Sequence, residues 1–389
     1  MKRWLGWIVF TVIVTIILLL TCSVFREIKT QPASYDSTIT LHWIQNYKTE
    51  TKEDFEEAFV WGLSFLGAEL PKDSLSSWLV WKDSNTFILH FEKAGFSTAA
   101  LVPINKVLYE LKRSEEYLKT KRIDAGRLMV QLLNNSSHYY AITGVAKTFD
   151  GFRNQYEWDP KKAAIIESVI AKKHRKINFS KPTGNKLAFF SEESGGSLLD
   201  STFRTSEFEV SELMPNGQFR YAIYDTFGNL KIAADSSKTS AGKPAKCIWC
   251  HEISIQPTYI AKTNVQNYYT FFQFDSIVAQ RYLLAQKYRK TLRSDLDFSE
   301  TQKHTLLEKL YISFMEPSLR RVALEWRMNS VSVSKKINRL PTHEHHEFKD
   351  LGLLYDRKEI DEKAPYSSLP VPGSARDLSD FEPNYLSKE

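Results

Sequence analysis

The segment Cys247-Ile248-Trp249-Cys250-His251 restricts the possible folds of this chain more than any other feature of its sequence. The chain has three cysteines, too few for a framework of disulfides, and two of them stand three positions apart, directly before a histidine. Two thiols and an imidazole within one turn of chain can all engage the same bulky group. Because aromatic residues make up 13% of the chain, they can supply the bulk of a pocket around such a group.

A zinc site and a redox-active dithiol are the two other uses of this spacing. A structural zinc ion needs a second pair of ligands with similar spacing, and the sequence has no other cysteine pair. A thioredoxin-like dithiol follows a strand and opens a helix within a βαβ unit. Here a stretch rich in Ser, Lys and Gly, residues 236–246, precedes the cysteines. Both alternatives therefore fit the sequence less well than the attachment of a cofactor.

These five residues resemble the haem-attachment signature of c-type cytochromes. The resemblance covers the five residues alone. It implies one covalent haem c, held by thioether bonds from Cys247 and Cys250, with His251 as the proximal iron ligand. The strand-like stretch Phe219–Ala233 ahead of Cys247 is also loosely similar to a small class of β-rich haem enzymes that oxidise hydroxylamine.

The N-terminus predicts export. Lys2 and Arg3 precede the uncharged apolar run Trp4–Leu20, which is the order of a positive region and an apolar core in a signal peptide. Haem is attached to c-type cytochromes only where exported chains are handled, so this signal agrees with the cysteine motif. We expect the body of the protein on the periplasmic side of a bacterial membrane.

Three fates of the apolar N-terminal run remain open. As an uncleaved anchor, Trp4–Phe25 is long enough to span a bilayer, which takes about 20 apolar residues. Alternatively, Leu19-Leu20-Thr21-Cys22 resembles a bacterial lipobox, which implies a lipoprotein with Cys22 lipidated. Thr21 departs from that signature, which usually has Gly, Ala or Ser there. The third fate is cleavage and full release, and the first two tether the protein to the membrane.

The charge balance argues against a nucleic-acid partner. Fifty-two Lys and Arg residues against 46 Asp and Glu residues give a net charge of +6, spread along the chain. Nucleic-acid-binding domains usually concentrate their basic residues on one face. The densest basic stretch, residues 172–176, closes a helical pattern, and we interpret it as a solvated helix end rather than a docking patch.

The order of the expected elements predicts an α+β protein. It has a mixed N-terminal region, a small antiparallel β-meander before the cysteine motif, and a helical C-terminal region. We divide the chain into a signal or anchor (1–25), a linker (26–40), a mixed α/β domain (41–155), a haem-bearing domain (156–340) and an extended tail (341–389).

Local signals place several elements in the first domain. Thr51-Lys52-Glu53-Asp54 begins a helix with a capping box. Residues 78–81 and 86–91 flank a polar turn and predict a hairpin. Two further helices are expected near Asn105–Thr120 and Ala125–Asn134.

In the second domain, Asp159-Pro160 predicts the start of a helix that continues to His174. After it, the hydrophobic period changes to that of strands, with turns at Asn216-Gly217 and Gly228-Asn229. The expected strands are 187–190, 208–213, 219–224 and 230–233, and the expected helices after the motif are 276–292, 299–314 and 317–328.

The sixth ligand of the haem iron has several candidates. Met315, just before the helix that Pro317 begins, is the leading one, and Met328 is a second. The polar run His343-Glu344-His345-His346 can supply an iron ligand or bind a separate metal. His138 fits a hydrogen-bonded core residue better than a ligand, and His304 fits a solvated helix face. An open iron site is the remaining alternative.

A single haem c moves one electron at a time, and a dedicated carrier needs only about a hundred residues to bury it. This chain is far longer, so its other regions have further roles. Our leading hypothesis is a membrane-tethered electron-transfer protein with redox partner proteins. The alternatives are an enzyme with an open iron site, such as a peroxidase or a small-nitrogen oxidase, and a haem-based sensor or a structural subunit.

Overall fold

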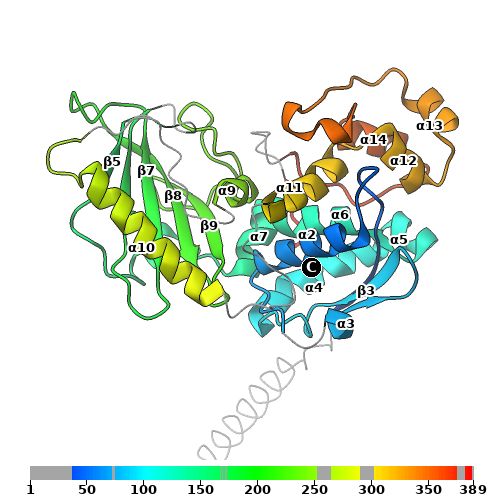
Figure 1. The fold of residues 1–389 in the computed structure, drawn as a ribbon, viewed down its shortest axis with the longest axis horizontal. Helices are drawn as coiled ribbons and strands as arrows, with labels where there is room; N and C mark the ends of the chain where they lie inside the picture. Colours follow the sequence, from blue (N-terminus) through cyan, green and yellow to red (C-terminus); the bar gives the residue numbers. More distant parts are fainter. Residues whose placement is uncertain are drawn as a thin grey trace, which may run out of the picture. The chain divides into compact units, whose positions relative to one another are not determined.

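The computed structural model describes residues 37–71, 75–166, 168, 170, 173–251, 264–289, 302–374 and 382–387. The packing groups Ser37–Glu389 into one compact unit, and the predicted boundaries at residues 155 and 340 lie inside it. Helices and two sheets make up this unit, which confirms the predicted α+β class (Figure 1). The predicted signal or anchor at 1–25, including Cys22, lies outside the described residues.

The first sheet has four strands in the order β2-β3-β1-β4. They are β1 (Thr38–His42), β2 (Leu79–Trp81), β3 (Thr86–His90) and β4 (Ile123–Asp124). β2 and β3 pair antiparallel with Trp81 opposite Phe87, which confirms the predicted hairpin. The predicted linker extends too far, because Ile39 and Leu41 alternate with threonines and bury one face of β1.

Helical segments lie between these strands and after them in the chain. They are α2 (Lys52–Ser64), α3 (Leu75–Trp78), α4 (Thr98–Arg113), α5 (Glu115–Thr120), α6 (Ala125–Met129), the π-helical turn η1 (Val130–Asn134), α7 (Ser136–Thr143) and α8 (Phe149–Arg153). The predicted capping box of α2 is confirmed: the Asp54 N–H donates to Thr51 Oγ over 3.1 Å and the Thr51 N–H donates to Asp54 Oδ2 over 2.9 Å. The helix predicted near residue 105 starts earlier and breaks at Ser114, whose hydroxyl caps α5. The helix predicted at 125–134 is confirmed as α6 and η1.

The second sheet contains five antiparallel strands in sequence order. They are β5 (Ala163–Ile165), β6 (Arg175–Phe179), β7 (Ala188–Ser194), β8 (Thr205–Leu213) and β9 (Phe219–Asp225). The predicted meander is therefore confirmed and is larger than expected. The turn at Gly217 has a φ of +83°, and a Cβ there would lie 2.2 Å from the Arg289 backbone nitrogen, so glycine is required at this position. Of the predicted strand 230–233, Leu230 makes one isolated bridge, to Tyr224.

The helix predicted at Asp159–His174 is wrong, because β5 lies within that range and β6 begins directly after it. Ala163 and Ile165 are both buried, which is the period of a strand, and they pair with β6. Strand pairing is a tertiary contact, and it overrides the local signal of a capping aspartate before a proline. The described part of the basic stretch, residues 173–176, is accordingly not a helix end. Its last two residues, Arg175 and Lys176, open β6.

The rest of the chain is helical. It contains α9 (Pro244–His251), α10 (Phe271–Arg289), α11 (Gln302–Met315), α12 (Leu319–Trp326), α13 (Ser330–Ile337), the 3-10 helix η2 (His346–Leu351) and α14 (Arg357–Lys363). The three helices predicted after the motif are confirmed as α10, α11 and α12. α10 lies along one face of the five-stranded sheet, with Phe274 packed on Phe179 of β6 (Figure 1).

The segment after residue 340 is not simply extended, since η2 and α14 lie within it. It also wraps over the N-terminal helices: the side-chain amides of Gln131 and Asn135 donate to the carbonyls of Pro370 and Pro383 over 2.6 Å each. Within the ranges given above, no helix combines the length and the apolar character needed to cross a membrane.

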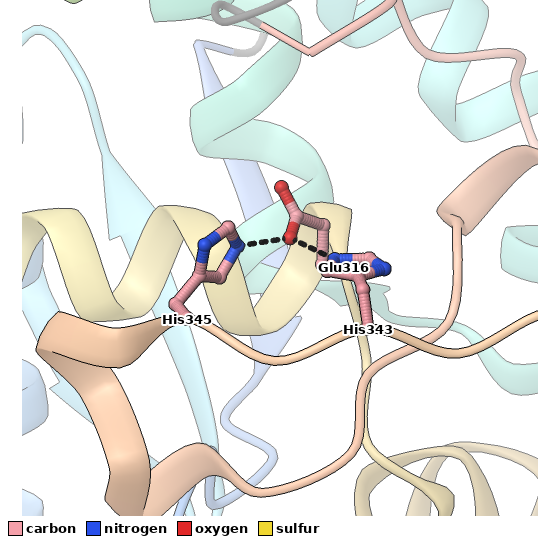
Figure 2. Close-up of side chains that lie close together, drawn as sticks. All are labelled: Glu316, His343 and His345. Atoms are coloured by element: carbon pink, nitrogen blue, oxygen red, sulfur yellow. Dashed lines mark hydrogen bonds and ion pairs between the residues drawn. The ribbon is translucent and has the colours of Figure 1, made fainter.

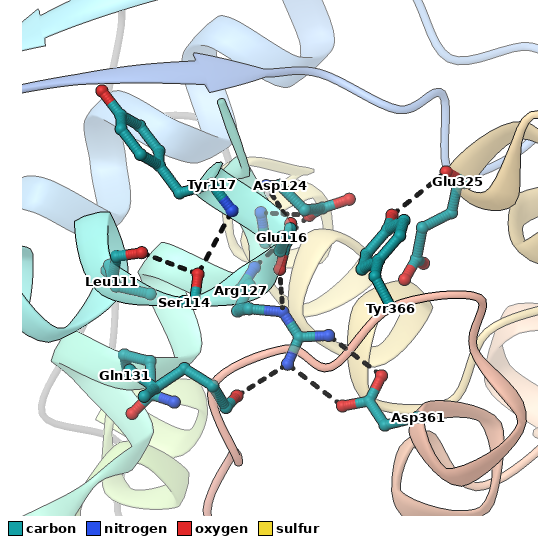
Figure 3. A network of polar contacts seen from close by, with 12 residues as sticks. Leu111, Ser114, Glu116, Tyr117, Asp124, Arg127, Gln131, Glu325, Asp361 and Tyr366 are labelled. Carbon is teal, nitrogen blue, oxygen red and sulfur yellow. Dashed lines mark hydrogen bonds and ion pairs between the residues drawn. The ribbon is translucent and has the colours of Figure 1, made fainter. Parts of the chain in front are cut away.

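Buried charges also join the N-terminal part of the chain to later helices. Arg127 of α6 lies between Glu116 of α5 and Asp361 of α14, with 3.1 Å from its Nε to Glu116 Oε2 and 2.9 Å from Nη2 to Asp361 Oδ1 (Figure 3). Arg321 of α12 likewise reaches Asp124, over 3.0 Å. Each buried guanidinium has a carboxylate partner, which offsets the cost of removing both charges from water.

Candidate functional site

The cysteine motif lies on α9, and its helical conformation divides its residues between two faces. Cys247 and His251 are four positions apart, so they share one face of the helix. Ile248 and Trp249 are buried elsewhere, and the Trp249 ring lies 4.8 Å from that of Tyr311 on α11. The backbone of Cys250 belongs to α9, while its side chain lies outside the described residues. The helix is thus anchored in the core through one side and presents Cys247 and His251 on another.

Cys247 and His251 both line a pocket between α9, α10 and the five-stranded sheet. The space between these elements amounts to about 930 Å³ with the open solvent at its mouth included. Most of its wall is apolar. The apolar and aromatic lining residues are Ile165, Ile177, Phe179, Phe189, Phe190, Val210, Phe219, Tyr221, Ala222, Phe274 and Val278.

The imidazole of His251 is held in the neutral form. Burial, with a smaller contribution from the charge of Arg175, lowers the pKa of His251 to about 4. The ring stacks on that of Tyr221 from β9, with centroids 6.0 Å apart. A neutral imidazole is the form that coordinates a metal ion, so His251 is prepared for the role that the motif implies.

Arg175 and Glu209 are the charged residues of the pocket wall. Arg175 Nε lies 3.2 Å from Glu193 Oε1, and its Nη2 is buried without a hydrogen-bond partner among the described residues. Burial and the neighbouring carboxylate of Glu193 raise the pKa of Glu209 to about 8, so this side chain is mainly protonated at neutral pH. The pocket therefore offers the guanidinium of Arg175, with one unused donor, and the carboxyl group of Glu209, whose Oε2 lies 3.9 Å from Arg175 Nη1.

The chemistry of this lining suits a haem. Apolar side chains suit the faces of a porphyrin, and the unused Nη2 of Arg175 suits one of its carboxylate groups. Cys247 and His251 open into the same space, as thioether attachment and coordination require. Cys247, Cys250 and His251 are the residues that would hold the group.

The candidate sixth ligands do not gather at this pocket. Met315 is 5% exposed, packs in the main core and is not part of the pocket wall, and Met328 packs in a separate cluster near α12. Among the described residues of the wall, His251 is the one imidazole and none is a methionine. The side chain of His304 lies outside the described residues.

His138 is a hydrogen-bonded core histidine, as predicted. Its Nδ1 lies 2.8 Å from the Gln131 carbonyl oxygen, and its Nε2 accepts from the Tyr385 N–H over 3.1 Å. Burial lowers the pKa of His138 to about 4, so the ring is neutral, with its proton on Nδ1. Both nitrogens are occupied, which leaves none for a metal.

The polar histidine run is divided. His343 and His345 converge on Glu316, whereas His346 is exposed and opens η2. Glu316 was missed from the sequence, as were Arg175, Glu209 and Tyr221 of the pocket. The alternating pattern of β9 was a usable signal for Tyr221 alone; the other three lie far from their partners along the chain.

No protein-family model, curated protein or solved structure matches this chain.

Proposed function

We propose that this protein carries one covalent haem c and transfers electrons on the periplasmic side of a bacterial membrane, tethered by its N-terminal segment. The observation that supports this is the pocket into which both Cys247 and His251 open. When bound there, the haem supplies an iron that takes up and releases one electron at a time. Redox partner proteins are its expected partners.

The residues of the chain have separate roles in this proposal. Cys247 and Cys250 fix the porphyrin, and His251 coordinates the iron with a neutral imidazole. The aromatic wall excludes water, which lowers the local dielectric constant and tunes the potential. Arg175 would supply a positive charge for a carboxylate group of the cofactor.

Haem attachment is tested by exporting the full chain from cells that also express a haem-attachment system. Wild type should keep its haem through denaturing electrophoresis, as detected by a peroxidase stain and by the mass of the chain. Cys247→Ala and Cys250→Ala should each reduce the retained haem, because one thioether remains at most. Cys22→Ser is the matched control and should retain haem fully. A wild-type chain that loses its haem under these conditions refutes the proposal.

An enzyme or sensor with an open iron site is the second candidate function. The observation that favours it is the pocket wall, whose described residues include no methionine and no second histidine. Glu209 adds a carboxyl group with a raised pKa to the same wall, which is a common feature of catalytic acids. Rapid binding of carbon monoxide to the ferrous wild type would favour this candidate. A slow reaction, with a six-coordinate spectrum, would favour the electron carrier.

A further inference from the structure

The end of α11 and the strand-like segment before η2 meet at three side chains that can hold a metal ion. Glu316 follows α11 directly, and its N–H donates to the Ile312 carbonyl over 2.6 Å. His343 is fixed by a two-way backbone bridge to Leu354, with N–O distances of 3.1 and 3.0 Å. The backbones of Glu316 and His343 are therefore held in place before any ion binds.

The extended backbone points both imidazoles the same way. His345 has φ −100° and ψ 123°, and in an extended chain the side chains of residues i and i+2 lie on one face. His343 and His345 thus both face Glu316, and Glu344 lies between them in the sequence, at the alternate position of the extended chain. Figure 2 shows the two rings on either side of the carboxylate.

The ligand atoms of the three residues are close to one another. His343 Nε2 lies 2.6 Å from Glu316 Oε2, and His345 Nε2 contacts the same oxygen. All three ligand atoms lie within 4.8 Å of one another. A tetrahedral zinc ion with bonds of about 2.0–2.2 Å keeps neighbouring ligand atoms roughly 3.3 Å apart. Small side-chain rotations therefore make room for the ion.

We propose that Glu316, His343 and His345 bind one divalent transition-metal ion, with Zn²⁺ as the ion that suits the ligands best. Two neutral imidazoles and a carboxylate are a ligand set of catalytic zinc and of non-haem iron. The side chains of Glu316 and His345 are 11% and 15% exposed, and that of His343 is 45% exposed. The ion is thus reachable from solvent, and a water molecule fills its fourth position.

This site is separate from the pocket beside His251. None of its three residues belongs to the wall of that pocket. The metal links the end of α11 to residues 343–345 and so strengthens the attachment of the C-terminal segment to the helical core. The inference does not depend on haem.

The test uses the full-length protein, stripped with a chelator and then titrated with Zn²⁺ by calorimetry, with zinc per chain measured by elemental emission. Wild type should bind one zinc ion and unfold at a higher temperature in its presence. Glu316→Gln and His345→Gln should each weaken zinc binding at least about tenfold, because each removes one of three ligands. Circular dichroism without metal shows whether the variants remain folded.

His346→Gln is the matched control, since His346 is an exposed neighbour outside the triad. It should bind zinc as wild type does. A flexible histidine run would instead lose affinity in His346→Gln and not respond to Glu316→Gln, and that result overturns the proposal. Absence of zinc binding to wild type overturns it as well, whatever the outcome of the haem experiment.

Discussion

Replacing Arg127 by methionine should destabilise the protein strongly. The side chain of Arg127 is 1% exposed and makes three hydrogen bonds with described residues: two to Asp361, of 2.9 and 3.0 Å, and one to the Leu369 carbonyl, of 2.9 Å (Figure 3). It also forms an ion pair with the buried Glu116. Methionine fills similar space without a charge, so the change isolates the polar contacts. These contacts join α5 and α6 to α14, so their loss should loosen the C-terminal segment.

The expected loss in the free energy of unfolding is about 3–5 kcal/mol at pH 7, the cost of breaking a buried ion pair from one side. Two hydrogen bonds to a charged carboxylate contribute about 1.5–3 kcal/mol each. Part of their sum is offset, because the variant no longer has the desolvation cost of a buried guanidinium. Burial raises the pKa of Glu116, and Arg127 opposes that rise. Without Arg127 the pKa of Glu116 rises further, and protonation of this carboxyl limits the damage.

The difference between wild type and variant should depend on pH. Burial by itself would raise the pKa of Asp361, but Arg127 and Arg357 bring it below its usual value. Because the pKa of Asp361 is lower in the folded protein than in the unfolded chain, where it is near 3.9, its ionisation stabilises the fold. This stabilisation is fully present above the pKa of the unfolded chain and is lost as the pH falls through the pKa of the folded protein. The variant has less of this stability to lose. The difference in the free energy of unfolding between wild type and variant should therefore become smaller below about pH 4.

Urea unfolding followed by circular dichroism and by tryptophan fluorescence measures the effect, and agreement of the two probes tests two-state behaviour. Arg339→Met, at an exposed arginine, is the matched control and should stay within about 0.5 kcal/mol of wild type. A loss in Arg127→Met no larger than in this control refutes the reasoning. The reasoning is also refuted if the difference in the free energy of unfolding is the same at pH 3.5 and at pH 7, which lie on either side of the usual carboxyl pKa of about 3.9.

Three further predictions follow from single features. Met315→Ala should cost about 2–5 kcal/mol of stability as a core truncation and leave the haem absorption spectrum unchanged; a spectral change would instead make Met315 an iron ligand. Thr51→Ala should cost about 1 kcal/mol in thermal or urea unfolding, because the capping box of α2 is lost, and an unchanged midpoint would contradict this. Deleting residues 1–25 should abolish haem loading in cells, and persistence of membrane sedimentation in Cys22→Ser would favour the uncleaved anchor over the lipoprotein.

Local signals were enough for the elements whose cause is local. The capping box at Thr51, the hairpin around residues 82–85 and the turn at Asn216-Gly217 each depend on side chains within a few positions, and all three are confirmed. The core role of His138 was also predicted. The interpretation of residues 247–251 likewise depends on five consecutive residues, and the haem that it implies stays a prediction.

Features that depend on distant partners were not accessible from the sequence. Residues 163–165 became a strand because β6 pairs with them, against a helix signal at Asp159-Pro160. Arg175 looked like part of a solvated basic run, yet pairing in the sheet turns it toward Glu193 and the pocket. The role proposed for Glu316 depends on two histidines that lie 27 and 29 positions away in the sequence. The sequence by itself determined which chemical groups the chain carries and where its local turns and caps form. Only the tertiary structure decided which groups meet, because packing and strand pairing act between residues that no local pattern connects.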